Sequence, residues 1–309
     1  MRIGFIGVGG VGGYFGGLLA AAGHDVVFVA RGAHLAAMQK NGLNIDSAAK
    51  PMQGLRVHAV SDAAGEKPCD LVILAVKLWD TDSALAAAKP LVGPQTRIAS
   101  VQNGIEAADK VLAAFGAEHA LGGVAQISAT IGEPGQIKHV GSMARLQLGA
   151  LNGGTLPLLA DFAAAAKQAG FDFAEPESIT RALWEKFVFL ASFSGVTALT
   201  RSSIGPIMAE PKTRALYEAA VREVCAIAEA KGAGLVPHHA ERAIEFTAKM
   251  PAGMKASMLH DLERGARLEL PWLSGAVAAL GRQHGVATPT HAFIDAALTL
   301  QAGGAQRPA

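Results

Sequence analysis

The sequence has few cysteines and little charge, and both shortages exclude classes of protein. Its two cysteines, Cys69 and Cys225, form no CxxC pair, so neither a cysteine-based zinc site nor a disulfide framework is expected. Such a chain suits a reducing cytosol. Lys and Arg number 27 against 26 Asp and Glu, a formal net charge of +1. This balance shows no excess of positive charge of the kind that binds nucleic acid or a membrane surface.

Long hydrophobic runs and metal-binding spacings are also missing. The longest uncharged apolar stretch, residues 187–200, is shorter than the roughly 18 residues that a membrane span needs. The glycine-rich N-terminus is typical of a strand and loop rather than of a signal peptide. The ten histidines show no HExxH or similar spacing. We therefore expect a cytoplasmic chain with no metal site and no membrane association.

The composition supplies ample apolar material for two domains. Of the 309 residues, 50% are hydrophobic and 17% charged, which favours sizeable cores over disorder. Apolar strands that alternate with helices, as in the first part of the chain, indicate a parallel sheet covered on both faces. Strands are expected at residues 2–7, 25–29, 71–76, 98–101, 122–130, 136–148 and 171–174, and helices after Pro176 at 179–199, 213–231, 238–250, 257–265 and 269–284. The predicted fold is α/β, with an N-terminal Rossmann-type doubly wound sheet in residues 1–176 and an all-helical domain in residues 177–309.

A glycine-rich motif stands directly after the first expected strand and opens a helix. It fits GxGxxG and reads Gly7-Val8-Gly9-Gly10-Val11-Gly12. The missing Cβ atoms permit a tight turn and let backbone N–H groups approach a pyrophosphate at the helix N-terminus. The alternative is a glycine turn that serves packing alone. The position of the motif predicts a dinucleotide cofactor.

The residue after the second strand bears on which dinucleotide binds. NAD sites usually carry an acidic residue at that strand end, about 20 residues beyond the motif, for the ribose 2′-hydroxyl. Here the strand is followed by Arg31, which can pair bidentately with a 2′-phosphate. A solvated surface arginine is the alternative. The substitution of a cation for the acid predicts NADPH.

Polar side chains follow two further strands of the expected sheet. Lys77 comes after the strand at 71–76, and Asn103 after the strand at 98–101. Ligands of open α/β sheets bind outside the carboxyl ends of the strands. Both residues are thus candidates for the cofactor cleft, although Asn103-Gly104 is also a common turn dipeptide.

The helical part offers a lysine, a serine and a glutamate. Lys186 precedes an uncharged stretch, and on a helix Leu190 and Ser194 share its face. Burial would lower the pKa of Lys186 and make it a better proton donor near neutral pH, whereas a surface lysine would keep its ammonium in water. Ser257 fits a helix N-cap and Glu269 an acidic first turn, so pattern alone assigns neither a role.

Together these segments resemble the ketopantoate reductase (2-dehydropantoate 2-reductase) family over nearly the whole chain. The resemblance rests on the glycine motif, Arg31, LAVK ending at Lys77, VQNG around Asn103, the EPG turn at 133–135, LWEKF around Lys186, and the stretch from SMLHDLERG at Ser257 through Glu269. It implies an NADPH-dependent oxidoreductase that reduces a 2-oxo acid by hydride transfer. Lys186 would be the proton donor, and NADPH would be bound by Gly7, Val8, Gly9, Gly10, Val11, Gly12, Arg31, Lys77, Asn103 and Glu269. The substrate would be bound by Asn103, Lys186, Leu190, Ser194 and Ser257.

The chain departs from the family pattern on the lysine helix. Members that match well carry asparagines four and eight residues after the lysine, where this sequence has Leu190 and Ser194. A pocket without those amides predicts weaker binding of ketopantoate and leaves open a more apolar 2-oxo acid. A non-catalytic NADPH-binding regulator and a β-hydroxyacid dehydrogenase are further alternatives, although residues 122–126 lack the Asp-Ala-Pro start of the latter's substrate loop. The sequence does not determine the oligomeric state, for which a homodimer is one hypothesis.

Overall fold

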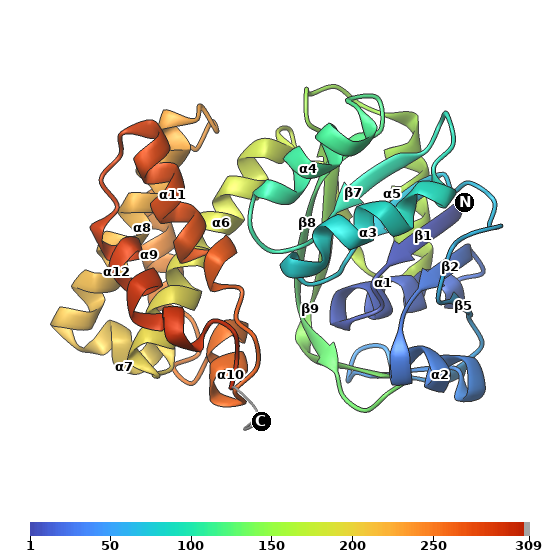
Figure 1. The fold of residues 1–309 in the computed structure, drawn as a ribbon, viewed down its shortest axis with the longest axis horizontal. Helices are drawn as coiled ribbons and strands as arrows, with labels where there is room; N and C mark the ends of the chain where they lie inside the picture. The colour runs from blue at the N-terminus through green and yellow to red at the C-terminus, as the bar shows by residue number, and fades with distance from the viewer. Residues whose placement is uncertain (306–309) are drawn as a thin grey trace. The chain divides into compact units, whose positions relative to one another are not determined.

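The chain folds into two compact units, as seen in a computed structural model that describes residues 1–305 (Figure 1). Unit 1 comprises Met1–Gln102 and Glu106–Ile179, and unit 2 comprises Asn103–Ile105 and the chain from Thr180 onwards. The sequence predicts a boundary after residue 176, whereas the structure divides the chain after Ile179. It also groups Asn103–Ile105, which follow strand β7 (Arg97–Ser100), with unit 2.

Unit 1 is built on one ten-stranded sheet with the order β4-β3-β9-β8-β7-β6-β1-β2-β5, and β10 pairs with β9. Strand β1 is parallel to both β2 and β6, and β6, β7 and β8 continue the parallel part. The strands are β1 Arg2–Ile6, β2 Asp25–Val29, β3 Leu43–Asp46, β4 Met52–Leu55, β5 His58–Val60, β6 Leu71–Leu74, β7 Arg97–Ser100, β8 Ala120–Ile131, β9 Gln136–Ala150 and β10 Asp172–Ala174. The chain thus winds in opposite directions from β1, which places a ligand crevice at the carboxyl ends of β1 and its neighbours.

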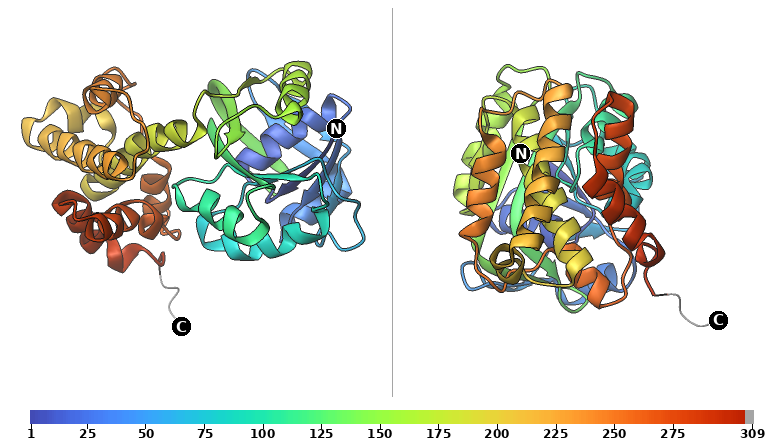
Figure 2. Two further views of the ribbon diagram at one scale, coloured as in Figure 1. Left: turned by 90° about the horizontal axis from the view of Figure 1, so that it is seen from above. Right: turned by 90° about the vertical axis from the view of Figure 1, so that its left-hand side faces the viewer.

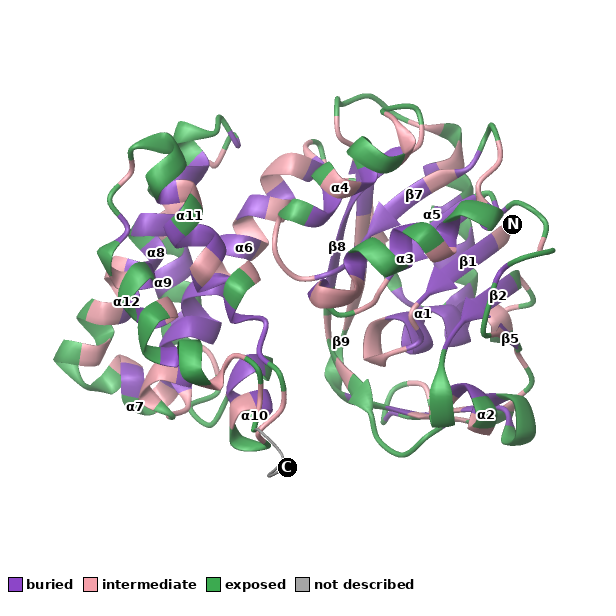
Figure 3. Cartoon of the chain, viewed as in Figure 1, coloured by how far each residue is buried: buried purple, intermediate pink, exposed green. Residues whose placement is uncertain are grey.

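Alternate residues of the central strands face opposite layers of helices. In β1, Ile3 and Phe5 join the apolar core under α1 (Gly10–Ala21) and α5 (Pro157–Ala169), while Ile6 joins the core under α3 (Thr81–Ala88) and α4 (Glu106–Phe115). Figure 2 shows helices on both faces of this sheet. Because both faces are covered, these strands are apolar throughout, and Figure 3 shows them buried along their lengths.

Unit 2 is helical and has its own core. Its helices are α6 Ile179–Thr200, α7 Ile204–Ala209, α8 Pro211–Ala230, α9 His239–Ala248, α10 Ser257–Glu263, α11 Ser274–His284 and α12 Pro289–Leu298. Among residues 1–305, α6 is the one helix long and apolar enough to cross a membrane, but 67% of that apolar window is buried inside the fold. Its apolar surface is covered by the neighbouring helices of the core, so α6 is accounted for as a core helix.

The observed fold is α/β with a Rossmann-type sheet and a helical second unit, as the sequence predicts. Several elements of unit 1 were not predicted, namely α2 (Gly32–Asn41), the short strands β3, β4 and β5, and α3 and α4. The three strands have only three or four residues each and are partly exposed. Unlike the equally short but wholly apolar β6, they mix polar and apolar residues, so the sequence gives no clear strand signal there.

Candidate active site

The glycines of the GxGxxG loop are required for different physical reasons. Gly7 has φ +94°, and a Cβ there would lie 2.5 Å from Val76. A Cβ on Gly12 would lie 2.1 Å from the Gly7 carbonyl oxygen, and one on Gly10 would lie 2.1 Å from the Ala129 carbonyl oxygen. A Cβ on Gly9 would meet no heavy atom within 4 Å. Packing therefore explains three of the glycines, whereas the open side of Gly9 fits a backbone cradle for phosphate.

A cleft of about 180 Å³ in unit 1 contains this loop. Its lining includes Gly7, Val8 and Gly9 from the loop, Arg31 after β2, and Asp80 ahead of α3. Arg31 is exposed and holds the N-cap position of α2 with extended backbone. The structure thus brings the glycine loop and the arginine into one cavity, and the residues present fit a phosphorylated dinucleotide.

His34 also lines the cleft, although no sequence motif indicates it. Its Nδ1 accepts a hydrogen bond of 3.0 Å from the Gly135 N–H in the turn between β8 and β9. Burial lowers the pKa of His34, while a bond to the Val8 carbonyl raises it. The ring is therefore a neutral imidazole, and its Nδ1 connects the start of α2 to the EPG turn.

Lys77 follows β6, as expected, and lies at the start of a 3-10 turn, Leu78–Asp80. It is exposed, and its Nζ lies 5.6 Å from the centroid of the Trp79 ring, within range of a cation–π interaction. As far as residues 1–305 show, Lys77 is not part of the cleft lining. Its sequence neighbours Val76 and Asp80 are part of the lining.

A buried polar network fixes the chain just before Asn103. The Gln102 side chain accepts a hydrogen bond of 3.0 Å from the Ser100 hydroxyl and donates one of 2.9 Å to Thr81 Oγ1. Thr81 in turn donates to the Leu78 carbonyl at 2.7 Å. These contacts join the end of β7 to the turn that follows Lys77. Sequence reasoning missed Gln102 and Thr81, because their pairing across the sheet edge leaves no periodic signal.

In unit 2, three of the predicted residues form one electrostatic group. The Asn103 side-chain amide donates a hydrogen bond of 3.1 Å to Glu269 Oε2, and Glu269 is only 4% exposed. Lys186, on α6, is partly exposed as a residue, but desolvation lowers its pKa to about 8. The charge of Glu269 acts in the opposite direction and raises it. This environment differs from that of a surface lysine, whose ammonium stays in water.

The structure corrects two local expectations about Ser257 and Glu269. Ser257 is not an N-cap, because Ala256 occupies that position, and Ser257 is the exposed first residue of α10. Glu269 does not open the following helix. It precedes a 3-10 turn, Leu270–Trp272, and α11 begins only at Ser274 because the backbone of Leu273, at φ −109° and ψ −98°, is not helical.

Leu190 and Ser194 differ in their exposure on α6. Leu190 is partly exposed and packs against the core of unit 2. Ser194 is fully buried, and its hydroxyl has no hydrogen-bond partner among the described residues. A buried hydroxyl without a partner carries a desolvation cost, so Ser194 lowers the stability of the fold at this position.

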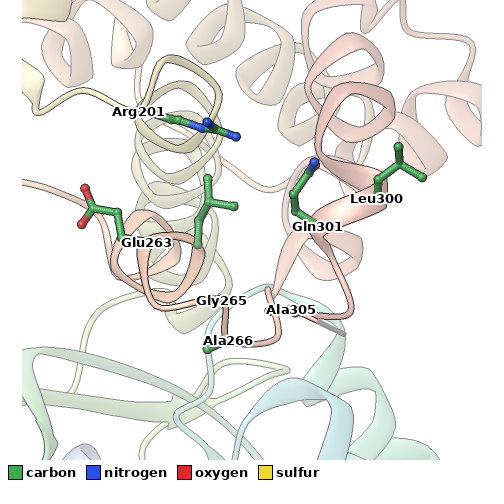
Figure 4. Close-up of a pocket in the computed structure, with 9 residues that line it drawn as sticks. Arg201, Glu263, Gly265, Ala266, Leu300, Gln301 and Ala305 are labelled. Atoms are coloured by element: carbon green, nitrogen blue, oxygen red, sulfur yellow. The ribbon is translucent and has the colours of Figure 1, made fainter. Parts of the chain in front are cut away.

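A second cavity, of about 610 Å³, lies in unit 2 and contains none of the predicted site residues. Figure 4 shows Arg201, Glu263 and Gln301 around it, with Leu300 at one side. Within residues 1–305 no group of three or more His, Cys, Asp or Glu side chains could hold a metal ion.

Comparison with known proteins identifies the chain. Residues 3–153 match the family "Ketopantoate reductase PanE/ApbA", and residues 178–301 match "Ketopantoate reductase PanE/ApbA C terminal". A 2-dehydropantoate 2-reductase of Mesorhizobium japonicum is 33% identical, over 97% of this chain and 96% of that protein.

Solved structures agree with this assignment. The crystal structure of 2-dehydropantoate 2-reductase from Geobacter metallireducens is 31% identical, with a TM-score of 0.89 over 97% of this chain and 99% of that one. A D-mandelate dehydrogenase solved with NADH and anilino(oxo)acetate is 20% identical, with a TM-score of 0.88 over 98% of each chain, and shares the fold. The chain therefore belongs to the ketopantoate reductase family, whose members are oxidoreductases that act on CH–OH groups and use a nicotinamide cofactor.

Proposed function

We propose that this protein reduces a 2-oxo acid to a 2-hydroxy acid with NADPH in the cytoplasm, as a 2-dehydropantoate 2-reductase does when it forms pantoate for pantothenate biosynthesis. The observation that carries the proposal is the lysine of α6. Lys186 has a pKa of about 8 and shares unit 2 with the hydrogen-bonded pair Asn103 and Glu269. A proton donor of this acidity is protonated at neutral pH and still transfers its proton readily.

The choice of NADPH over NADH rests on Arg31. It lines the cleft that contains the glycine loop, and its guanidinium can pair bidentately with a 2′-phosphate. Gly7, Val8, Gly9, Gly10, Val11 and Gly12 would hold the pyrophosphate, while Lys77, Asn103 and Glu269 would contact the remainder of the cofactor. NADPH, when bound, supplies the hydride that is added to C2 of the substrate.

The chain's own residues would supply the proton and the charge stabilisation. Lys186 would donate a proton to the carbonyl oxygen of the 2-oxo acid as that oxygen gains negative charge. Glu269 would keep the lysine protonated, in line with its effect on the lysine pKa, and the hydrogen bond from Asn103 would hold the carboxylate in place. Ser257, exposed at the start of α10, would bind the substrate carboxylate region.

A second candidate substrate class is a 2-oxo acid with an apolar tail. Leu190 lies one helical turn beyond Lys186, and a leucine cannot hydrogen-bond a substrate hydroxyl. Ser194 is fully buried, and neither leucine nor serine has a side-chain amide. An apolar substrate group beside Leu190 would lose no hydrogen bond.

A steady-state assay with NADPH and a panel of 2-oxo acids tests the proposal. We expect NADPH oxidation with ketopantoate, with apolar 2-oxo acids, or with both, and a 2-hydroxy acid as the product. No turnover with any 2-oxo acid, together with tight NADPH binding, would favour the non-catalytic regulator. Turnover of 3-hydroxy acids instead would favour a β-hydroxyacid dehydrogenase.

A further inference from the structure

Asp80 places a negative charge in the same cleft as Arg31. It stands at the end of the 3-10 turn that follows β6, directly ahead of α3. Its side chain makes no capping bond to α3. Among residues 1–305, no hydrogen bond or ion pair satisfies this carboxylate, and none joins it to Arg31. A carboxylate that lines a cavity without a partner is available to a ligand.

Small, apolar side chains line the cleft between Asp80 and Arg31. Val29 and Ala30 come from the end of β2, and Ala84 and Ala87 come from α3 on the side of Asp80. Small aliphatic side chains leave room for a flat ring and give it apolar contact on its faces. The glycine loop at the end of β1 lines the same cleft. The lining therefore has space for phosphates and for a planar base. It also contributes one side chain, Asp80, that only accepts hydrogen bonds.

We propose that Asp80 determines the base specificity of the cofactor cleft, by accepting a hydrogen bond from the exocyclic amino group of adenine. This inference rests on the proposed use of NADPH. The residue that usually contacts the ribose stands at the end of the second strand, and here that place belongs to Arg31. Asp80 comes from the turn after β6, a different element, so it is assigned to the base. Adenine presents an N–H donor at this position, whereas hypoxanthine presents a carbonyl oxygen.

The test measures dissociation constants by isothermal titration calorimetry, without substrate or turnover. The ligands are NADPH and its hypoxanthine analogue, and the proteins are the unaltered chain, Asp80→Asn and Asp82→Asn. Asp82→Asn is the matched control, because it removes the same charge from the first turn of α3 at an exposed residue that pairs with Lys110. We expect the unaltered chain and the control to bind NADPH at least about tenfold more tightly than the analogue. Asp80→Asn should abolish or invert that preference, because an amide can donate to the hypoxanthine carbonyl.

Other outcomes contradict the inference in distinguishable ways. If Asp80→Asn strengthens the binding of both ligands equally, the carboxylate faces the phosphates and repels them, and the assignment to the base is wrong. If Asp80→Asn binds both ligands as the unaltered chain does, Asp80 does not contact the cofactor. If no variant binds NADPH, the proposed cofactor fails and this inference fails with it. If NADPH binds well and only the preference is absent, the proposed function stands and the inference alone is wrong.

Discussion

Asn103 and Glu269 are 166 positions apart in the chain, yet the amide of one donates a hydrogen bond of 3.1 Å to the carboxylate of the other. The contact joins two side chains that have different neighbours. Glu269 influences the pKa of Lys186, and Asn103 follows the strand end that Gln102 secures. The same bond thus holds in place the carboxylate that raises the pKa of Lys186.

Replacement of Arg31 by alanine should weaken NADPH binding and leave NADH binding little changed. Only NADPH carries the 2′-phosphate that the guanidinium can pair with. We expect a loss of about tenfold or more in NADPH affinity, the scale of a charged hydrogen bond. Direct titration of both cofactors measures this, with Arg56→Ala as a control at another exposed arginine of unit 1. Equal losses of affinity for both cofactors would show that Arg31 does not bind the 2′-phosphate.

Replacement of Lys186 by alanine should lower kcat at least about a hundredfold, the usual scale for a lost general acid. The NADPH dissociation constant should stay close to that of the unaltered protein, since the glycine loop and Arg31 belong to unit 1. Lys231→Ala, at an exposed lysine after α8, is the matched control. Normal turnover by the Lys186 variant would exclude it as the proton donor.

The pKa of Lys186, about 8 instead of the ordinary 10.5, predicts a pH profile. Reduction needs the protonated lysine, so kcat/KM should fall tenfold per pH unit above about 8. Oxidation of the hydroxy acid needs the neutral lysine, so it should rise with pH up to about 8 and level off above that value. The shift also affects stability. The unfolded chain holds this proton more tightly, so the contribution of Lys186 to the free energy of unfolding should increase from pH 8 to pH 10.5.

The Lys186→Arg variant checks the assignment of this pH limb. An arginine remains protonated throughout the accessible range, so any residual activity should lose the fall above pH 8. A limb that persists unchanged in this variant would belong to a different group. A limb near 10.5 in the unaltered protein would show that the ammonium is solvated during turnover.

The substrate prediction concerns Leu190 and Ser194. In the unaltered protein we expect a higher kcat/KM for a 2-oxo acid with an apolar tail than for ketopantoate. A polar group that faces leucine loses water without a partner, which costs about 1–3 kcal/mol. Leu190→Asn, alone and with Ser194→Asn, should shift the ratio of kcat/KM values towards ketopantoate by about tenfold or more.

Leu199→Asn, near the end of α6, controls for the general effect of an amide on this helix. Thermal unfolding should accompany the kinetics, because Ser194 is fully buried and a larger side chain there has no space without rearrangement. A clear preference of the unaltered protein for ketopantoate would show that Leu190 does not contact the part of the substrate that distinguishes these acids.

The sequence predicts the parts of the fold that rest on local patterns. Strands β1 and β6 are short but almost entirely apolar and buried, and helix α6 is long and apolar. The position of the glycine loop between a strand and a helix favours a dinucleotide site. Strands β3 to β5 were missed because they mix polar and apolar residues and are partly exposed, whereas β6 is equally short but wholly apolar. Asn103 and Lys186 are candidates by their positions after a strand and on an uncharged helix, whereas Glu269 is a candidate only through the resemblance. The bond between Asn103 and Glu269 depends on tertiary folding, so no local pattern predicts it. His34, Asp80 and Gln102 left no signal, because what distinguishes them is a partner or a cavity distant in sequence.

The three residues Asn103–Ile105 interrupt unit 1 in the chain, although they belong to unit 2 in space. This interruption constrains how the gene can be recombined. A chimera joined at position 179 would take Lys186 and Glu269 from one parent and Asn103 from the other, and so would divide the hydrogen-bonded pair between lineages. A functional exchange of the helical half must carry residues 103–105 with it as a second, separate insert.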